Sequence, residues 1–161
     1  MKRAPRVSLW LFLGALVFCG CDGGSSARLP PPGFNAEFGK HNVPTQVTAG
    51  RTFSTEITVT NASPIPWPSK PNPRGKNAVH LSYHWLDQQR KTIVYDGLRT
   101  KLPGDLEPGE SVTLRALIRS PDNPGEYVLQ ITLVQEGVAW FSDLGGGEVS
   151  LPVAVVRGDL N

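Results

Sequence analysis

The sequence predicts an all-β domain, an antiparallel sandwich of seven or eight strands. Two observations lead to this prediction. Apolar and polar residues alternate in several short segments, as in strands with one buried face, and Gly/Pro turn signals separate these segments. No window beyond the N-terminal segment shows the 3.6-residue period of an amphipathic helix.

The clearest of these segments spans residues 124–141 and begins with a Pro-Gly turn signal. Its apolar residues Tyr127, Leu129, Ile131 and Leu133 share one face, which is typical of a half-buried strand. Gln-Glu-Gly at residues 135–137 interrupts the pattern, and Val-Ala-Trp-Phe at residues 138–141 resumes it. The other strands are expected to pack on this one.

The remaining strands follow from the same alternation. The Asp-Gly pair at residues 96–97 predicts a hairpin between the strands on either side of it. The loop at residues 61–75 holds five prolines and cannot be a central strand, and Pro152 places the last strand at an edge. This spacing predicts an immunoglobulin-like sandwich in which Trp85 is the buried tryptophan of the third strand. The predicted strands are residues 52–60, 79–85, 92–95, 98–102, 112–118, 127–133, 138–141 and 149–155.

The N-terminus predicts export. A basic start precedes twelve residues, 7–18, of which only Ser8 is polar, and this run is too short to span a membrane but fits a signal peptide. The Cys-Gly-Cys that follows resembles a bacterial lipobox with Cys21 as the acceptor, although Phe18 replaces the usual leucine. The resemblance implies cleavage after residue 20, acyl chains on Cys21 and a cell-envelope lipoprotein facing the periplasm or the exterior. The alternative is an ordinary signal peptide with Cys21 as a free thiol.

The domain organisation follows from composition. Residues 1–20 are the predicted lipoprotein signal peptide, and residues 21–42 are the lipidated cysteine and a Gly/Ser/Pro-rich flexible linker. Phe34 and Phe38 within the linker fit either a first edge strand or a surface position. Residues 43–157 form the predicted sandwich and residues 158–161 a tail.

The charge balance argues against a nucleic-acid partner. Three of the 16 basic residues (Lys2, Arg3 and Arg6) lie in the predicted signal peptide, which leaves 13 basic against 14 acidic residues. A nearly neutral body without a basic cluster is not typical of nucleic-acid binding. The two cysteines, Cys19 and Cys21, are one residue apart and cannot form an internal disulfide framework.

Six runs of the sequence occur together in one known type of domain. They are Tyr-His-Trp at residues 83–85, Asp-Gly-Leu-Arg-Thr at 96–100, Leu-Pro at 102–103, Pro-Gly at 108–109, Pro-Gly-Glu-Tyr at 124–127 and Leu-Val-Gln-Glu-Gly-Val-Ala-Trp-Phe at 133–141. Together they resemble a bacterial β-sandwich module that is often appended to glycosyltransferases and other envelope polysaccharide proteins. More distantly they are similar to the four-tryptophan domain of autophagy receptors, with Trp67, Trp85 and Trp140 as three of the tryptophans. The resemblance covers roughly residues 47–155 and implies an immunoglobulin-like fold.

No pattern in the sequence predicts catalysis, a cofactor or a metal ion. His80 and His84 share a strand face but would lie about 13 Å apart, too far for one zinc, and we expect surface histidines. No nucleophile elbow or phosphate-binding loop is present, and the Gly-Gly-Gly at residues 145–147 has no helix after it. We therefore expect that the protein is not an enzyme.

The candidate binding residues are aromatic and polar side chains near turns. Trp140 and Trp67 could expose a ring face to a sugar or a peptide, and Arg99, Gln135 and Glu136 could add directional polar contacts. The alternative is internal: both tryptophans in satellite packing, an Arg99–Glu136 ion pair, and Gln135 bonded to a loop backbone. The expected role is binding of envelope glycan by a membrane-anchored protein, or else protein–protein assembly in an envelope complex.

Overall fold

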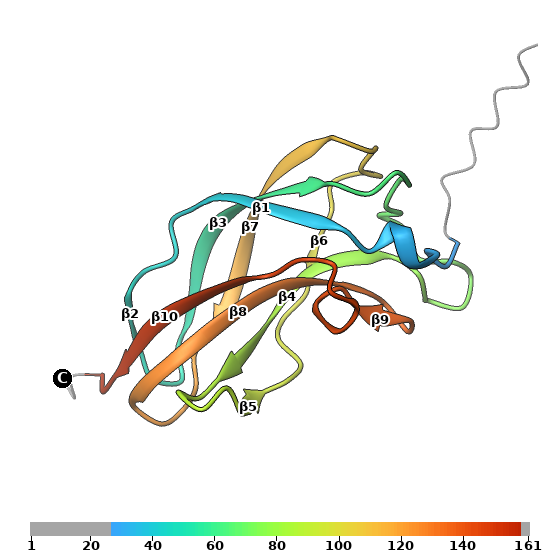
Figure 1. Ribbon diagram of the computed structural model, residues 1–161. Helices are drawn as coiled ribbons and strands as arrows, with labels where there is room; N and C mark the ends of the chain where they lie inside the picture. Colours follow the sequence, from blue (N-terminus) through green and yellow to red (C-terminus); the bar gives the residue numbers. More distant parts are fainter. Residues whose placement is uncertain (1–26, 159–161) are drawn as a thin grey trace, which may run out of the picture.

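A computed structural model describes residues 27–158 (Figure 1), so the predicted signal peptide, Cys21 and most of the predicted tail lie outside the described residues. The described part contains ten strands and two short 3₁₀ helices, with no α-helix. The elements are η1 (Pro31–Gly33), β1 (Ala36–His41), β2 (Gln46–Thr48), β3 (Thr52–Asn61), β4 (Val79–Leu86), β5 (Thr92–Val94), β6 (Thr100–Lys101), β7 (Ser111–Arg119), β8 (Gly125–Gln135), β9 (Ala139–Trp140), η2 (Ser142–Leu144) and β10 (Val149–Val156).

The strands form two sheets that pack face to face, which confirms the predicted sandwich (Figure 1). The smaller sheet has the order β1-β3-β7, and the larger has the order β2-β10-β8-β4-β5. β6 also pairs with β4, and β9 pairs with β8. All pairings are antiparallel except that of β2 with β10. This arrangement, with the first strand divided between the sheets, is immunoglobulin-like.

The core lies between the sheets and contains the residues that alternation assigned to it. Trp85 on β4 is fully buried, as predicted, and its Nε1 donates to the carbonyl oxygen of Arg119. The hydroxyl of Tyr127 donates to the carbonyl oxygen of Asn123 at the entrance to β8. This bond is the tyrosine corner of immunoglobulin folds, which fixes the turn into that strand.

The folded domain begins before the predicted boundary at residue 43. β1 pairs with β3 and forms an edge of the smaller sheet, so the first of the two alternatives for Phe38 is correct. Upstream of β1, Leu29 and Phe34 are buried in the main core. The composition of residues 21–42 did not indicate that they belong to the folded domain, because the few apolar side chains that pack into the core are separated by prolines and glycines.

The predicted hairpin across Asp96 and Gly97 is wrong. β5 and β6 do not pair with each other in the described structure; both pair with β4, at its two ends. The loop between them lies against β4, because the N–H of Gly97 donates to the carbonyl oxygen of Tyr83. A Cβ on Gly97 would lie only 2.5 Å from that oxygen, so the close approach requires glycine.

Pro152 does not mark an edge strand, because β10 lies between β2 and β8. The N–H of Ala154 donates toward β2, to the carbonyl oxygen of Thr45, and the ring nitrogen of Pro152 faces the same side two residues earlier. β2 pairs only with Ala154, Val155 and Val156. The proline therefore lies where that side of β10 has no partner strand, and its missing donor costs no ladder bond.

Candidate binding site

The candidate site lies on the outer face of the larger sheet, around the loop of residues 95–99. This loop connects β5 to β6 and is fixed to β4 at its centre, where the hydroxyl of Ser82 donates to the carbonyl oxygen of Gly97 at 3.1 Å. The turn between β8 and β9 lies beside it and contributes Glu136. Residues far apart in the sequence thus meet on one surface.

Arg99 is the centre of the site. Its Nε donates to Glu136 Oε1 at 2.6 Å, and its Nη1 donates to Asp96 Oδ1 at 2.7 Å and to the carbonyl oxygen of Gly97 at 2.7 Å. His80 Nδ1 lies 3.0 Å from the same oxygen of Glu136. One guanidinium thus joins the loop of residues 95–99 to the turn after β8.

Aromatic rings form a second layer of the site. The Arg99 guanidinium lies 4.7 Å from the centre of the Trp140 ring, in a cation–π contact. The rings of His84 and Tyr95 are stacked at 4.9 Å, and Trp140 contacts both. Trp140 is only 7% exposed, whereas Tyr95 is 54% exposed. Since His84 covers one face of Tyr95 and the side chain remains half exposed, Tyr95 presents the accessible ring surface of the site.

The electrostatic surroundings shift three pKa values. Burial lowers the pKa of His84, although its Nδ1–H donates to the carbonyl oxygen of Tyr95, which opposes the shift. Burial alone would lower the pKa of Arg99, but Glu136 and Asp96 raise it above its ordinary value. Partial burial and the neighbouring Asp143 carboxylate raise the pKa of Tyr95. At neutral pH the site therefore presents a neutral imidazole, a charged guanidinium and a protonated phenol.

The site includes an open pocket of about 320 Å³ between the loop and the turn. Such a volume is in the range of small-ligand pockets. An aromatic ring beside carboxylates and a guanidinium can stack on a sugar ring and bond its hydroxyls. The lining residues are Tyr95, Asp96, Arg99, Val134, Gln135, Glu136, Gly137, Val138, Ala139 and Trp140.

The structure brings the side chains of three of the five predicted binding residues, Arg99, Glu136 and Trp140, into one cluster; Gln135 also borders the pocket, but its side chain is fully buried. The predicted Arg99–Glu136 ion pair, which was the internal alternative, is present. Of the two alternatives for Trp140, internal packing is correct and a half-exposed ring is not, because Arg99 and two aromatic rings cover it.

Gln135 and Trp67 serve a different purpose. The side chains of Gln135 and Trp67 are both fully buried, so the internal alternative is correct for each, with Trp67 in the main core and Gln135 bonded to backbone groups. Trp67 Nε1 donates to the carbonyl oxygen of Gly33 at 2.7 Å. Gln135 accepts a bond from the N–H of Leu29 and donates to the carbonyl oxygen of Ala27, both at 2.9 Å. Both side chains hold the segment that precedes β1.

Sequence reasoning missed Tyr95 and Asp96 as site residues, and it missed His84 as a buried one. The Tyr-Asp-Gly run at residues 95–97 was the sequence signal that could have indicated these site residues, but it was interpreted as the tip of a hairpin. An aromatic residue next to a carboxylate on a loop is a reasonable sign of binding, but its position beside Trp140 depends on pairing that the pattern does not contain.

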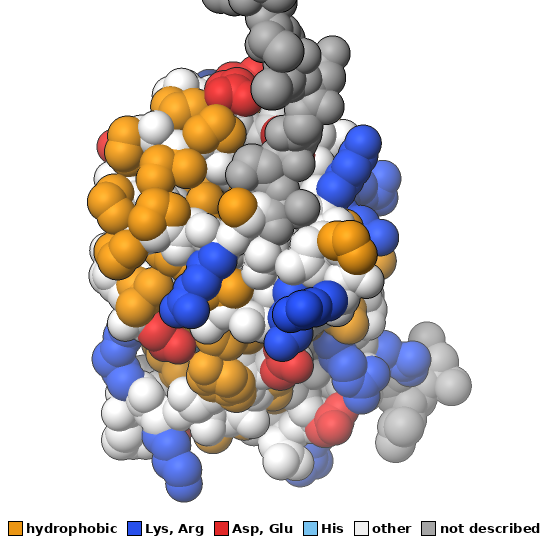
Figure 2. Space-filling view, turned by 90° about the vertical axis from the view of Figure 1, so that its right-hand side faces the viewer, with side chains coloured by type: hydrophobic (Ala, Val, Ile, Leu, Met, Phe, Trp, Pro, Cys, Tyr) orange, Lys and Arg blue, Asp and Glu red, His pale blue; other side chains and the backbone are white. Residues whose placement is uncertain are grey.

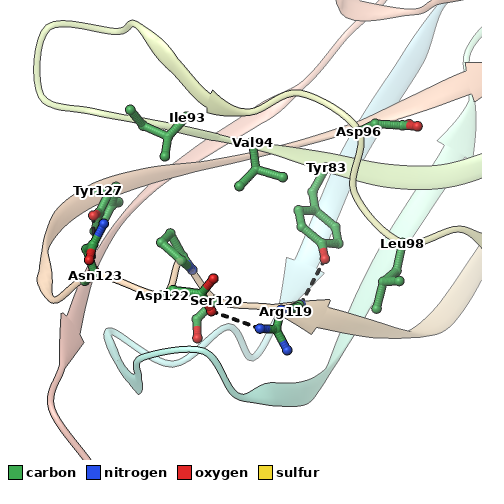
Figure 3. A pocket seen from close by; sticks show the side chains of 11 residues that line it. Tyr83, Ile93, Val94, Asp96, Leu98, Arg119, Ser120, Asp122, Asn123 and Tyr127 are labelled. Carbon is green, nitrogen blue, oxygen red and sulfur yellow. Dashed lines mark hydrogen bonds and ion pairs between the residues drawn. The ribbon is translucent and has the colours of Figure 1, made fainter.

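A second groove, of about 340 Å³, lies between the two sheets, with β5 and the loop after it on one side and the end of β7 on the other (Figure 3). Exposed Ile93 and Leu98 lie at this groove, which we call the Ile93 groove. The hydroxyl of Tyr83 points across it and accepts a bond from the N–H of Arg119, which is also paired with Asp122 (Figure 3).

Within residues 27–158, no group of His, Cys, Asp and Glu side chains is arranged to hold a metal ion. Over the same residues, no helix is long and apolar enough to cross a membrane.

No family model and no curated protein matches this chain. Among solved structures it is similar to a CARDB domain from Pyrococcus furiosus, with 17% identity and a TM-score of 0.43 over 77% of this chain and 98% of that one. It is also similar to part of a β-glucosidase from Listeria innocua in complex with glucose, with 18% identity and a TM-score of 0.45 over 76% of this chain and 16% of the enzyme. At these identities and scores, the likeness says nothing about ligand or activity.

Proposed function

We propose that this protein is a non-catalytic lipoprotein of the bacterial cell envelope, acylated at Cys21, whose immunoglobulin-like domain binds envelope glycan. The lipobox resemblance at residues 19–21 supports the anchor. The observation that carries the glycan proposal is the ring of Tyr95, which is backed by His84 and lies beside Asp96 and Arg99.

This geometry suits a sugar better than a peptide backbone or an anion. The apolar face of a pyranose can lie on the accessible side of Tyr95. Its hydroxyls can donate to Asp96 and Glu136 and accept from Arg99, which the two carboxylates hold in place. Two carboxylates around one guanidinium leave no net positive charge to attract an anionic ligand.

Tyr95→Ala tests the site. The variant should lose retention on purified envelope polysaccharide by about tenfold or more, because an aromatic anchor dominates a small interface. Leu117→Ala is the matched control, since Leu117 is also a half-exposed apolar side chain (53%) but lies on β7 in the other sheet. Equal retention of Tyr95→Ala and the control, with both proteins folded, would overturn the glycan proposal.

The anchor has its own test. The intact mass of the membrane-fraction protein should correspond to a chain that begins at Cys21 and carries acyl groups, and Cys21→Ser should abolish this mass. A soluble chain with a free thiol would contradict the anchor and leave the glycan test unaffected.

One observation favours assembly with another envelope protein as a second function. β7 is an edge strand of the smaller sheet, and the Ile93 groove lies beside its end. At the two ends of β7, the N–H of Asn61 donates to the carbonyl oxygen of Glu110, and the N–H of Ser120 donates to that of Arg51. The even-numbered residues of β7 therefore face β3, and the N–H groups of its odd-numbered residues face outward. A partner strand could add to this edge. Leu117→Lys should then release a co-purifying envelope protein while glycan retention stays unchanged.

A further inference from the structure

The described chain begins at a fixed point on one end of the sandwich. Gln135 bonds both Ala27 and Leu29, and Trp67 bonds Gly33. η1 and β9 lie at this end, whereas β5 lies at the other end (Figure 1). We call the end with η1 and β9 the tether end, because the predicted anchor joins the domain there.

The reach between the anchor and this end is short. Five residues, 22–26, separate Cys21 from Ala27. Even a fully extended chain covers at most about 3.6 Å per residue, so Ala27 lies within about 20 Å of Cys21. An acylated Cys21 therefore holds the tether end close to the bilayer, within the reach of long side chains and lipid headgroups.

The tether end presents apolar surface. A groove of about 640 Å³ lies between the segment before β1 and the loop that contains η2. Leu144 in this loop is 55% exposed, and Pro30 and Pro31 are exposed as well. Figure 2 faces this end and shows a patch of hydrophobic side chains with lysine and arginine side chains beside it. The groove is lined by Arg28, Leu29, Pro30, Pro31, Phe34, Val138, Ala139 and Leu144.

Positive charge lies on the segment before η1 and on the loop between β3 and β4, which is at the tether end (Figure 1). Arg28, Lys70, Arg74 and Lys76 are all exposed, and the chain has no acidic residue between Glu56 and Asp87. Lys76 lies against the turn between β8 and β9, where a Cβ on Gly137 would meet its side chain at 2.9 Å.

Three carboxylates lie near these cations: Glu136, which is paired with Arg99 in the turn that Lys76 contacts, and the exposed Asp105 and Asp143. Asp105 bonds the hydroxyl of Ser69, and Asp143 lies 3.4 Å from the hydroxyl of Tyr95. Neither forms an ion pair with the four basic side chains among the described residues.

We propose that the tether end rests on an anionic lipid surface, with Leu144 at the headgroups and the basic side chains on lipid phosphates. The proposal depends on the acylation of Cys21. Apolar contact combined with several basic side chains is what peripheral membrane surfaces use, and basic residues near an anionic leaflet each add about fivefold to binding. In this orientation β5 and the Ile93 groove face away from the bilayer.

The experiment uses the acylated protein in vesicles and one environment-sensitive fluorophore. Cys19 and Cys21 are the only cysteines, so an introduced cysteine is the single free thiol once Cys21 is acylated. Leu144→Cys places the label at the tether end, and Gln89→Cys places it in the exposed turn before β5 as the matched control. Each is measured in phosphatidylcholine vesicles with and without phosphatidylglycerol.

The label at residue 144 should shift its emission to the blue in the anionic vesicles, and the label at residue 89 should not. Arg74→Glu combined with Lys76→Glu should reduce the shift at residue 144, whereas Lys91→Glu in the control turn should leave it unchanged. Acylated protein with identical emission at both positions would overturn the proposed orientation alone. Protein without acyl mass would overturn the anchor and the orientation together.

Discussion

Gln135 and Glu136 are neighbours in the chain, yet they belong to two regions with opposite properties. Gln135 is fully buried, and its side chain bonds backbone groups of Leu29, Ala27 and Asn77. Glu136 points to the other side, into a partly exposed cluster with Arg99 and His80. The comparison shows that residue type alone does not determine whether a polar side chain stabilises the fold or faces a ligand. The direction of the side chain decides it: Gln135, the last residue of β8, points to the segment before β1, whereas Glu136, the first residue of the turn after β8, points to Arg99 and His80.

Trp67 and Tyr95 show the same contrast between a buried and an exposed side chain, and substitution of Trp67 should have the largest effect on stability. Trp67→Ala should lower the free energy of unfolding by about 4 kcal/mol, because a fully buried ring is replaced by a cavity. Tyr95→Ala should cost less than about 1 kcal/mol, since the ring is half exposed. Urea unfolding of the two variants measures the difference. Similar losses would mean that Tyr95 is structural and weaken its assignment to binding.

The next effect contrasts the neighbours themselves. Gln135→Leu should lower the free energy of unfolding by about 3 kcal/mol, because it removes the partners of Leu29, Ala27 and Asn77 in a buried place. Glu136→Gln should cost about 1 kcal/mol, since water can reach the groups that it leaves. Amide hydrogen exchange of Leu29 should accelerate only in the Gln135 variant. Unchanged exchange there would show that Gln135 does not hold the segment.

Arg99→Lys should have a smaller effect on stability and a specific effect on the loop. A lysine cannot make the bonds that Arg99 makes to Glu136, Asp96 and Gly97 at once, so we expect a loss of about 1 kcal/mol. Hydrogen exchange at Gly97 should rise while that in β8 stays as before. A uniform rise across both elements would indicate global unfolding instead of release of the loop.

The smallest effect is a pH dependence. Burial lowers the pKa of His84 in the folded protein below the ordinary value of about 6.5, so the unfolded chain binds more protons as the pH falls below that value. Stability should therefore decrease as the pH drops from about 6.5 toward the lowered pKa, and above about 6.5 this contribution should be constant.

His84→Gln tests this dependence. The groups that face His84 are Tyr95, Trp140, Arg99, Asp143 and Glu148, and the variant leaves all of them in place. The thermal midpoint of the variant should fall less steeply with decreasing pH than that of the parent. Parallel curves would assign the pH dependence to carboxylates.

Much of the fold could be predicted because it depends on local patterns. Alternation located β3, β4, β7, β8 and β10 to within a few residues, and the phase of Trp85 with its neighbours predicted its burial. For β1 the sequence left an edge strand and a surface position open, since the inner face of this strand carries a single alanine and an aromatic residue, and its pairing with β3 depends on a distant strand. The predicted hairpin at Asp96 was wrong for the same reason: the N–H of Gly97 bonds a carbonyl oxygen of β4, and the local pattern does not contain this contact.

By itself the sequence determined the all-β class, the main strands, the buried tryptophan of β4 and the Arg99–Glu136 pair as one of two alternatives. Only the tertiary structure decided that Gln135 and Trp67 hold the N-terminal segment, that Trp140 is covered and that Tyr95 is the accessible ring. Alternation is a property of neighbouring residues, and the sequence contains it. Which surface covers a given side chain depends on segments far away in the sequence, from 34 positions between Trp67 and Gly33 to 108 positions between Gln135 and Ala27, and a local pattern does not encode that pairing.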